Sequence, residues 1–283
     1  MKLKSISLLI LIFLSSFITG QSLKAEKAKD EFRDFEHNAP AHVQEFYRLN
    51  HCYQTLDFVL GKKAEYSPLN KKNLSIWEAF EVLDTLVDES DPDISVPQVY
   101  HAFQTAEALR NDNQPEWLVL TGFIHDLGKM LTLFNEPQWA VVGDTFPVGC
   151  AYEQAIVFPN FFIFNSDNSH EIYTSKYGIY SPQCGLQNLH MSWGHDEYLY
   201  IVMNEYLPKE ALYIIRFHSF YAYHTHGAYH YLMDDYDKEM LPWLQLFSSY
   251  DLYSKSNTEV DFNALIPYYK GLVDRYFPQK IAW

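Results

Sequence analysis

Apolar residues recur at helical spacing along most of this 283-residue chain. Between residues 42 and 63, Val43, Phe46 and Tyr47 begin an apolar stripe that continues to Val59, which predicts an amphipathic helix. Ser75 is placed to cap a second helix, which the acidic turn at 88–93 ends. The same spacing predicts further helices over residues 96–111, 115–134, 192–207, 208–221, 239–250 and 263–277.

The pattern changes between residues 134 and 189. Prolines, glycines and short apolar runs there predict loops and a small hairpin. No internal repeat, low-complexity tract or linker divides the chain. We therefore expect one mainly α domain over residues 23–283, built as a helical bundle with this loop and hairpin excursion.

The first 22 residues follow a different pattern. Lys2 and Lys4 precede an apolar run at 6–18, and small or polar residues follow at 19–22, which is typical of a secretory signal peptide. The run is shorter than the ~20 residues that span a bilayer. Cleavage near residues 20–22 would export the protein to the periplasm or outside the cell. An uncleaved membrane anchor or a misassigned start codon are the alternatives, and no later segment could insert stably into a membrane.

Composition narrows the possible functions. Hydrophobic residues make up 48% of the chain, which supports a large core and excludes a disordered protein. The net charge of −15 argues against a nucleic-acid partner, which would require a basic surface. The three cysteines have no CxxC spacing, so neither a thiolate metal site nor a disulfide framework is expected. No GxGxxG fingerprint is present, so no flavin or nicotinamide cofactor is expected.

The chemistry is concentrated at histidines and aspartates on predicted helices. An apolar helix runs directly into His125-Asp126, where an imidazole and a carboxylate would be costly to bury without a partner. A lone His-Asp pair is more often a hydrogen-bonded couple than a metal site. Four further residues, however, lie on or beside apolar helix faces: His101, His195, His218 and Asp251. Together they form a ligand set suited to iron, manganese or zinc in a helical bundle.

The order of His101, His125-Asp126 and Asp251 resembles the HD-domain superfamily, whose commonest activity is metal-dependent phosphohydrolysis. The sequence motifs around these residues are more specific and resemble those of the myo-inositol oxygenases. They are VDESDPD (87–93), HAFQTAE (101–107), HDLGK (125–129), PQWAVVGDTFPVGC (137–150), MSWGHDEYLY (191–200), IRFHSFY (215–221) and DLY (251–253). The similarity extends from about Phe32 to Trp283.

This resemblance implies an HD-domain-like fold and a mixed-valent pair of iron ions, Fe(II)/Fe(III), that opens the ring of myo-inositol with O2 to give D-glucuronate. We expect the protein to be a monomer. One iron would bind His101, His125 and Asp251, the other His195 and His218, with the Asp126 carboxylate bridging. Asp126 and Lys129 would take part in catalysis. The implied substrate contacts are Arg33, Asp88, Glu89, Ser90, Lys129, Gly143, Asp144, His218, Ser219 and Lys255.

Some features leave alternatives open. Lys129 follows His125 by four residues and Asp126 by three, so it shares their helix face and can reach the substrate; a solvated lysine at a helix end is the alternative. His226 and His230 are extra histidines, either on the surface or competing for metal. Relatives of the family are cytoplasmic, unlike a chain with a signal peptide. An HD-type phosphohydrolase and an inactive inositol-binding or metal-binding protein are the competing functions.

Overall fold

The computed structural model describes residue 35 and residues 39–84, 88–90, 98–253 and 261–283. The expected signal peptide, Arg33 and Lys255 lie outside the described residues. Cleavage and export therefore stay predictions. Among the described residues, no helix is both long and apolar enough to cross a membrane.

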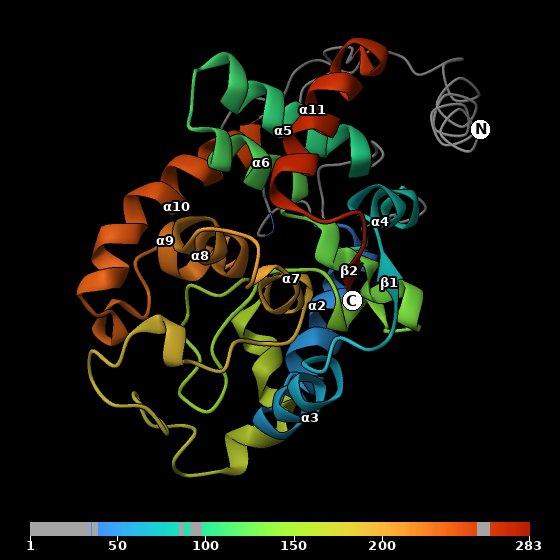
Figure 1. Ribbon diagram of the computed structural model, residues 1–283. Coiled ribbons are helices and arrows are strands. Elements are labelled where there is room, and N and C mark those ends of the chain that lie inside the picture. Colours follow the sequence, from blue (N-terminus) through green and yellow to red (C-terminus); the bar gives the residue numbers. More distant parts are fainter. Residues whose placement is uncertain (1–34, 36–38, 85–87, 91–97, 254–260) are drawn as a thin grey trace.

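Helices dominate the described part of the chain, which confirms the predicted mainly α fold (Figure 1). Their bounds are α2 (Ala41–Tyr53), α3 (Leu56–Tyr66), α4 (Ile76–Leu83), α5 (Gln98–Asn111), α6 (Glu116–Ile124), α7 (His195–Met203), α8 (Lys209–Phe217), α9 (Tyr221–His224), α10 (Asp235–Tyr253) and α11 (Phe262–Tyr276). Short 3-10 helices are η2 (Leu127–Phe134), η3 (Gln138–Ala140), η4 (Pro159–Phe164), η5 (Ser166–Ser169), η6 (Leu186–Asn188) and η7 (His230–Leu232).

The single helix expected over residues 42–63 is instead two helices, α2 and α3. The break falls at Gln54 and Thr55, where the Thr55 side chain accepts a hydrogen bond from the Phe58 amide and caps α3. The Gln54 side chain is bonded to both the backbone NH and the carbonyl of Trp193. A contact between distant segments therefore ends α2 although the apolar stripe continues.

The sequence predicted where α4 and α6 begin more accurately than it predicted α2 and α3. Ser75 caps α4 and forms a capping box with Glu78, as its position in the sequence predicted. The helix expected over 115–134 begins after Pro115 but is α-helical only to Ile124, and it tightens into η2 from Leu127. The change of helix type takes place at His125 and Asp126.

The hairpin expected between residues 134 and 189 is absent. That segment consists of loops and 3-10 turns, with an isolated bridge between Pro147 and Met191. The two short strands of the described residues are β1 (Asn73–Leu74) and β2 (Ile281–Ala282), which pair antiparallel. The C-terminal end of the chain is thus tied to the loop before α4, and Trp283 beyond β2 is fully buried.

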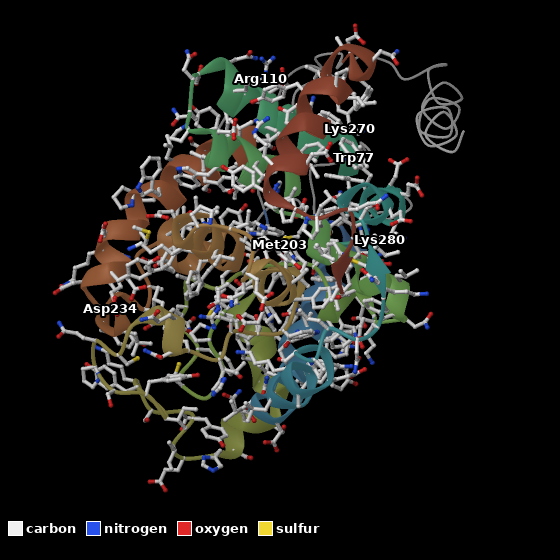
Figure 2. All side chains as sticks on the ribbon, in the orientation of Figure 1. Trp77, Arg110, Met203, Asp234, Lys270 and Lys280 are labelled. Carbon is white, nitrogen blue, oxygen red and sulfur yellow. The ribbon has the colours of Figure 1, made fainter. Side chains whose placement is uncertain are left out.

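The core lies between helix pairs. Helix α5 packs on α6, α7 packs on α8 and on η2, and α10 packs on α8, α5 and α6. Met203 at the end of α7 is fully buried, whereas Lys270 and Lys280 are exposed (Figure 2). The elements that meet in the core are the ones that carry the predicted metal ligands.

Candidate metal centre

Five elements bring the six predicted ligands into the core. His101 lies on α5, His125 and Asp126 stand where α6 becomes η2, and His195 is the first residue of α7. His218 caps the C-terminus of α8, and Asp251 lies near the end of α10. None of the six is more than 7% exposed. Buried imidazoles and carboxylates of this number require mutual pairing or a cation.

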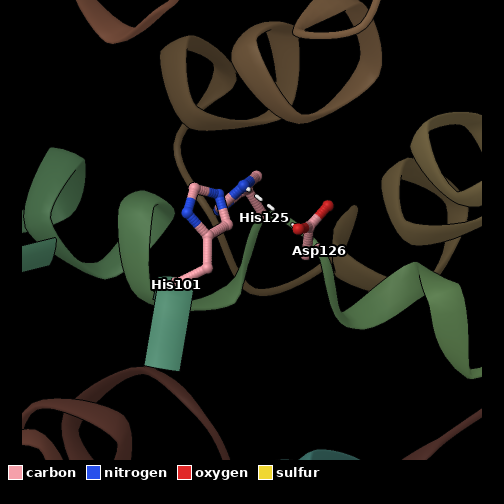
Figure 3. A group of neighbouring side chains, drawn as sticks. All are labelled: His101, His125 and Asp126. Carbon is pink, nitrogen blue, oxygen red and sulfur yellow. Dashed lines mark ion pairs between the residues drawn. The ribbon is translucent and has the colours of Figure 1, made fainter. Parts of the chain in front are cut away.

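His101, His125 and Asp126 form the first group, with ligand atoms within 4.8 Å of one another (Figure 3). Asp251 belongs to the same cluster, because its Oδ1 lies 2.8 Å from Nε2 of His101 and 3.2 Å from Nε2 of His125. The four side chains come from three elements but point toward one place.

Asp126, His195 and His218 form the second group, again within 4.8 Å. Asp126 is shared, and its two oxygens face different groups. Its Oδ2 lies 3.5 Å from Nε2 of His125, whereas its Oδ1 lies 3.4 Å from Nε2 of His195 and 3.9 Å from Nε2 of His218. A carboxylate in this position can bridge two cations.

The histidine tautomers favour a cation in the second group. Nδ1 of His195 lies 2.9 Å from the Val141 carbonyl, and Nδ1 of His218 lies 2.9 Å from the Ile215 carbonyl. A carbonyl only accepts, so both Nδ1 atoms donate and both Nε2 atoms of the neutral rings carry lone pairs. Those Nε2 atoms are 3.2 Å apart. Two lone pairs at this distance repel unless a proton or a metal ion lies between them.

The first group has a similar arrangement at His125, whose Nδ1 lies 2.9 Å from the Gly122 carbonyl. This leaves its Nε2 directed at Asp126 and Asp251. Backbone carbonyls that hold the remote nitrogen are typical of metal-ligating histidines. His101 differs, because its Nδ1 has no hydrogen-bond partner among the described residues. The donor set and its orientation fit a pair of metal ions.

Charge pairing sets the ionisation of the cluster. Burial by itself would raise the pKa of Asp126, but Lys129 and His125 hold that pKa well below its usual range. Burial would also raise the pKa of Asp251, but His125 and His101 hold that pKa well below its usual range. Burial opposes the charged form of His218, yet Asp196 and Asp126 raise its pKa to about 9. Both carboxylates are therefore ionised and ready to bind a cation.

Lys129 is buried and faces anions rather than solvent. Its Nζ lies 3.0 Å from Oδ2 of Asp126, 2.9 Å from Oδ2 of Asp88 and 2.8 Å from Oε1 of Gln98. Burial favours the neutral amine, but Asp126 and Asp88 raise the pKa of Lys129 above its ordinary value. Lys129 is thus not a solvated helix-end residue. It joins the shared carboxylate to one of the predicted substrate contacts.

The other predicted substrate contacts fall into two places. Ser90 is buried and donates through its amide and hydroxyl to Asp88, while Glu89 between them is exposed. Asp144 is buried and accepts a hydrogen bond from the Tyr47 hydroxyl.

The loop that carries Asp144 lies against the second histidine group. Gly143 has a φ of +96°, which favours glycine, and a Cβ there would overlap Phe46. The Thr145 amide donates to the Ser219 carbonyl at 2.9 Å, and the His195 amide donates to the Val141 carbonyl at 2.7 Å. Residues 141–145 therefore connect Ser219 with His195.

Comparison with known proteins agrees with this geometry. Residues 40–283 match the family model described as myo-inositol oxygenase. The chain is 52% identical over 261 residues to inositol oxygenase 1 of Arabidopsis thaliana, with 89% of this chain and 84% of that protein covered. It is 49% identical to the inositol oxygenase of Bos taurus, covering 92% and 93%, and 48% identical to that of Dictyostelium discoideum, covering 91% of each. The chain belongs to the myo-inositol oxygenase family.

Within this member of the myo-inositol oxygenase family, sequence reasoning missed two polar residues of the centre. Asp196 is 1% exposed and its Oδ1 lies 2.9 Å from Nε2 of His195. Gln98 holds the Lys129 amine. In the sequence, the motif MSWGHDEYLY places Asp196 directly after His195, a predicted ligand. This adjacency was the only signal that could have identified Asp196. Its neighbour Glu197 instead pairs with Arg216 and Lys63, away from the histidines.

The helix expected to begin at residue 192 begins at His195 instead. Gly194 stands at the N-cap of α7, while the Ser192 hydroxyl accepts a hydrogen bond from the Phe146 amide. His226 and His230 are exposed and belong to neither histidine group, in agreement with the surface interpretation.

Proposed function

We propose that this protein is an inositol oxygenase that cleaves the ring of myo-inositol with O2 to give D-glucuronate. Family membership supports the reaction, and one observation carries it for this chain. The two oxygens of buried Asp126 face two separate pairs of histidines. A purely structural role would not require a carboxylate shared between two groups of imidazole nitrogens, so this arrangement supports a two-metal centre.

We infer that the two groups bind two iron ions. His101, His125 and Asp251 would hold one, His195 and His218 the other, and Asp126 would bridge them. Each group combines two imidazoles with a carboxylate, the ligand type found in non-haem iron oxygenases. When bound, such a mixed-valent pair would supply the Lewis acidity for a chelated diol and the redox capacity for O2.

The electron balance supports the absence of an organic cofactor. Ring cleavage converts inositol and O2 into the hexuronic acid and one water, so the substrate itself provides all four electrons. This chain's residues then have to orient the polyol and hold protons. Asp88, Asp144 and Ser219 offer acceptors and a hydroxyl for the substrate's hydroxyl groups. The Lys129 ammonium, held by Asp126 and Asp88, can donate to an oxygen that becomes negatively charged.

Electrostatics disfavour the alternative, an HD-type phosphohydrolase. Phosphate recognition requires uncompensated cations near the metals. Lys129, the described cation beside the centre, is already neutralised by Asp126 and Asp88, and Asp144 adds a further carboxylate. A phosphate ester would meet the carboxylates of Asp88 and Asp144, whereas a neutral polyol finds hydrogen-bond partners in them.

The test is O2 consumption by iron-loaded protein with myo-inositol as the only substrate. We expect one O2 consumed and one D-glucuronate formed per inositol, with two irons per chain by elemental analysis. Phosphate ester hydrolysis is measured in parallel on the same preparation. Release of phosphate without inositol-dependent O2 uptake would replace the proposal by its alternative.

A further inference from the structure

Asp196 occupies an unusual place beside the second histidine group. It lies in the first turn of α7, directly after His195, and is almost fully buried. Its Oδ1 lies 2.9 Å from Nε2 of His195 and 3.6 Å from Nε2 of His218. Since those two nitrogens are 3.2 Å apart, three electron-rich atoms surround one point.

The same carboxylate holds the residue after His218. The Ser219 amide donates to Oδ2 of Asp196 at 3.1 Å, and the Ser219 hydroxyl donates to Oδ1 at 3.0 Å. Asp196 therefore connects the start of α7 with the end of α8. Through these two bonds it also sets the direction of the Ser219 hydroxyl, which we expect to contact the substrate.

The buried charge of Asp196 faces imidazoles rather than a permanently charged side chain. No lysine or arginine pairs with it among the described residues, and its partners are the two histidines and Ser219. A buried carboxylate directed at two imidazole nitrogens requires a cation beside it, either a proton on one of the rings or a metal ion between them.

We propose that Asp196 is a further positioning residue of the metal centre, whose charge strengthens cation binding by His195 and His218 and whose hydrogen bonds hold Ser219 toward the substrate. This inference rests on the proposed function, because it requires the second metal ion. It predicts two separable effects. Removing the charge weakens the second metal, while removing only the bond to the serine hydroxyl affects the substrate.

Two variants separate these effects. Asp196→Asn keeps the size of the side chain and one acceptor oxygen but removes the charge. Ser219→Ala removes one hydrogen bond and leaves the charge in place. Asp237→Asn is the matched control, because Asp237 is a fully buried carboxylate that accepts from Leu186, Asp234 and Tyr213, away from the histidines.

The experiment titrates metal-free wild type and the three variants with Fe2+ under anaerobic conditions. Iron retained after gel filtration is measured by elemental analysis, and folding is checked by circular dichroism. We expect two irons in wild type, Ser219→Ala and Asp237→Asn. In Asp196→Asn the second iron should bind roughly tenfold to a hundredfold more weakly, the usual effect of losing a residue that supports metal ligands, while the first stays bound.

Kinetics provide the second measurement. Ser219→Ala should raise KM for myo-inositol with its iron content unchanged, and Asp196→Asn should lower kcat in proportion to the lost second iron. Undiminished affinity for the second iron in Asp196→Asn would overturn the inference while leaving the proposed function intact. So would loss of the second iron in Ser219→Ala, which keeps the charge. Wild type that retains fewer than two irons would instead count against the proposed metal centre itself.

Discussion

Single side chains determine what this centre can bind. The decisive feature is the direction of the imidazole nitrogens. At His125, His195 and His218, a backbone carbonyl holds Nδ1, so Nε2 is left to face Asp126 or a neighbouring imidazole. The side chains are therefore held in position for a cation before it binds.

Alanine substitution of the second histidine pair tests the ligand assignment. His195→Ala or His218→Ala should lose about one of two irons and nearly all inositol-dependent O2 uptake, because the second cation would keep one imidazole and a shared carboxylate. Elemental analysis and O2 consumption measure the two effects. His226→Ala, an exposed histidine from the same region, serves as control and should change neither. A double His195, His218 variant that still turns over inositol would contradict the assignment.

Lys129→Ala should lower kcat/KM for myo-inositol by roughly tenfold to a hundredfold. A hydrogen bond from a charged group contributes about 1.5–3 kcal/mol, and about 1.4 kcal/mol corresponds to a factor of ten. Iron content should stay at the wild-type level, since Asp126 loses only its ammonium partner. Lys129→Arg should not restore the rate, because the planar guanidinium differs from a compact ammonium. Steady-state kinetics measure this effect, with Lys238→Ala, a substitution of an exposed lysine, as the control. A wild-type kcat/KM in Lys129→Ala would refute a role for Lys129 in substrate handling.

The contact between η2 and α7 leaves no room for a side chain at Gly128. Gly128 on η2 packs against the backbone of His195, and a methyl group at Gly128 would overlap the His195 carbonyl. Backbone atoms cannot move aside as a flexible side chain can. The approach of η2 to α7 thus holds His195 within reach of Asp126.

Gly128→Ala should therefore destabilise the protein by about 1–3 kcal/mol, the usual effect of overpacking, and weaken the second iron. Gly61→Ala is the control, because a Cβ on Gly61 of α3 meets nothing within 4 Å. That variant should instead gain up to about 1 kcal/mol from helix propensity. Thermal unfolding and iron content measure both. Equal stability of the two variants would show that the contact has no such role.

Over the whole molecule, the metal-free centre couples stability to pH. His218 has an ordinary pKa of 6.5 that rises to about 9 in the fold, so its contribution is fully present below pH 6.5 and is lost as pH rises through about 9. Asp126 and Asp251 have depressed pKa values, so their contributions are present above the ordinary 3.8 and are lost as pH falls below it.

The Tm of chelator-treated protein should consequently fall between pH 6.5 and 9, and again in acid. In His218→Gln the fall between pH 6.5 and 9 should be smaller, because the titrating group is gone. Thermal scans of both proteins across this range, with chelator present, test the coupling. Parallel curves for the two proteins would contradict it.

Export is a further property of the whole chain. The charged start, the apolar run at 6–18 and the small residues after it predict cleavage of a signal peptide. N-terminal sequencing of protein from its native host should then begin between Gln21 and Ala25. An intact Met1 in a cytoplasmic fraction would rule this out and favour the usual location of the family.

Local sequence was sufficient wherever neighbours along the chain control the outcome. Ser75 directly precedes the apolar pattern of α4, and the N-cap that this position predicted is present. The helical settings of the six candidate ligands were likewise predictable, because apolar residues surround each of them in the sequence. The mainly α fold followed from the same periodicity.

Local patterns of this kind could not predict contacts between segments that are distant in the sequence. The break after α2 depends on Gln54 bonding Trp193, 139 residues away, and the strand pair joins residues 73–74 to 281–282. Only packing directed Asp196 at two histidines while its neighbour Glu197 turned to Arg216. A residue's type and spacing thus set which bonds it can form, but the partner is decided by whichever element the folded chain brings within about 3 Å of it.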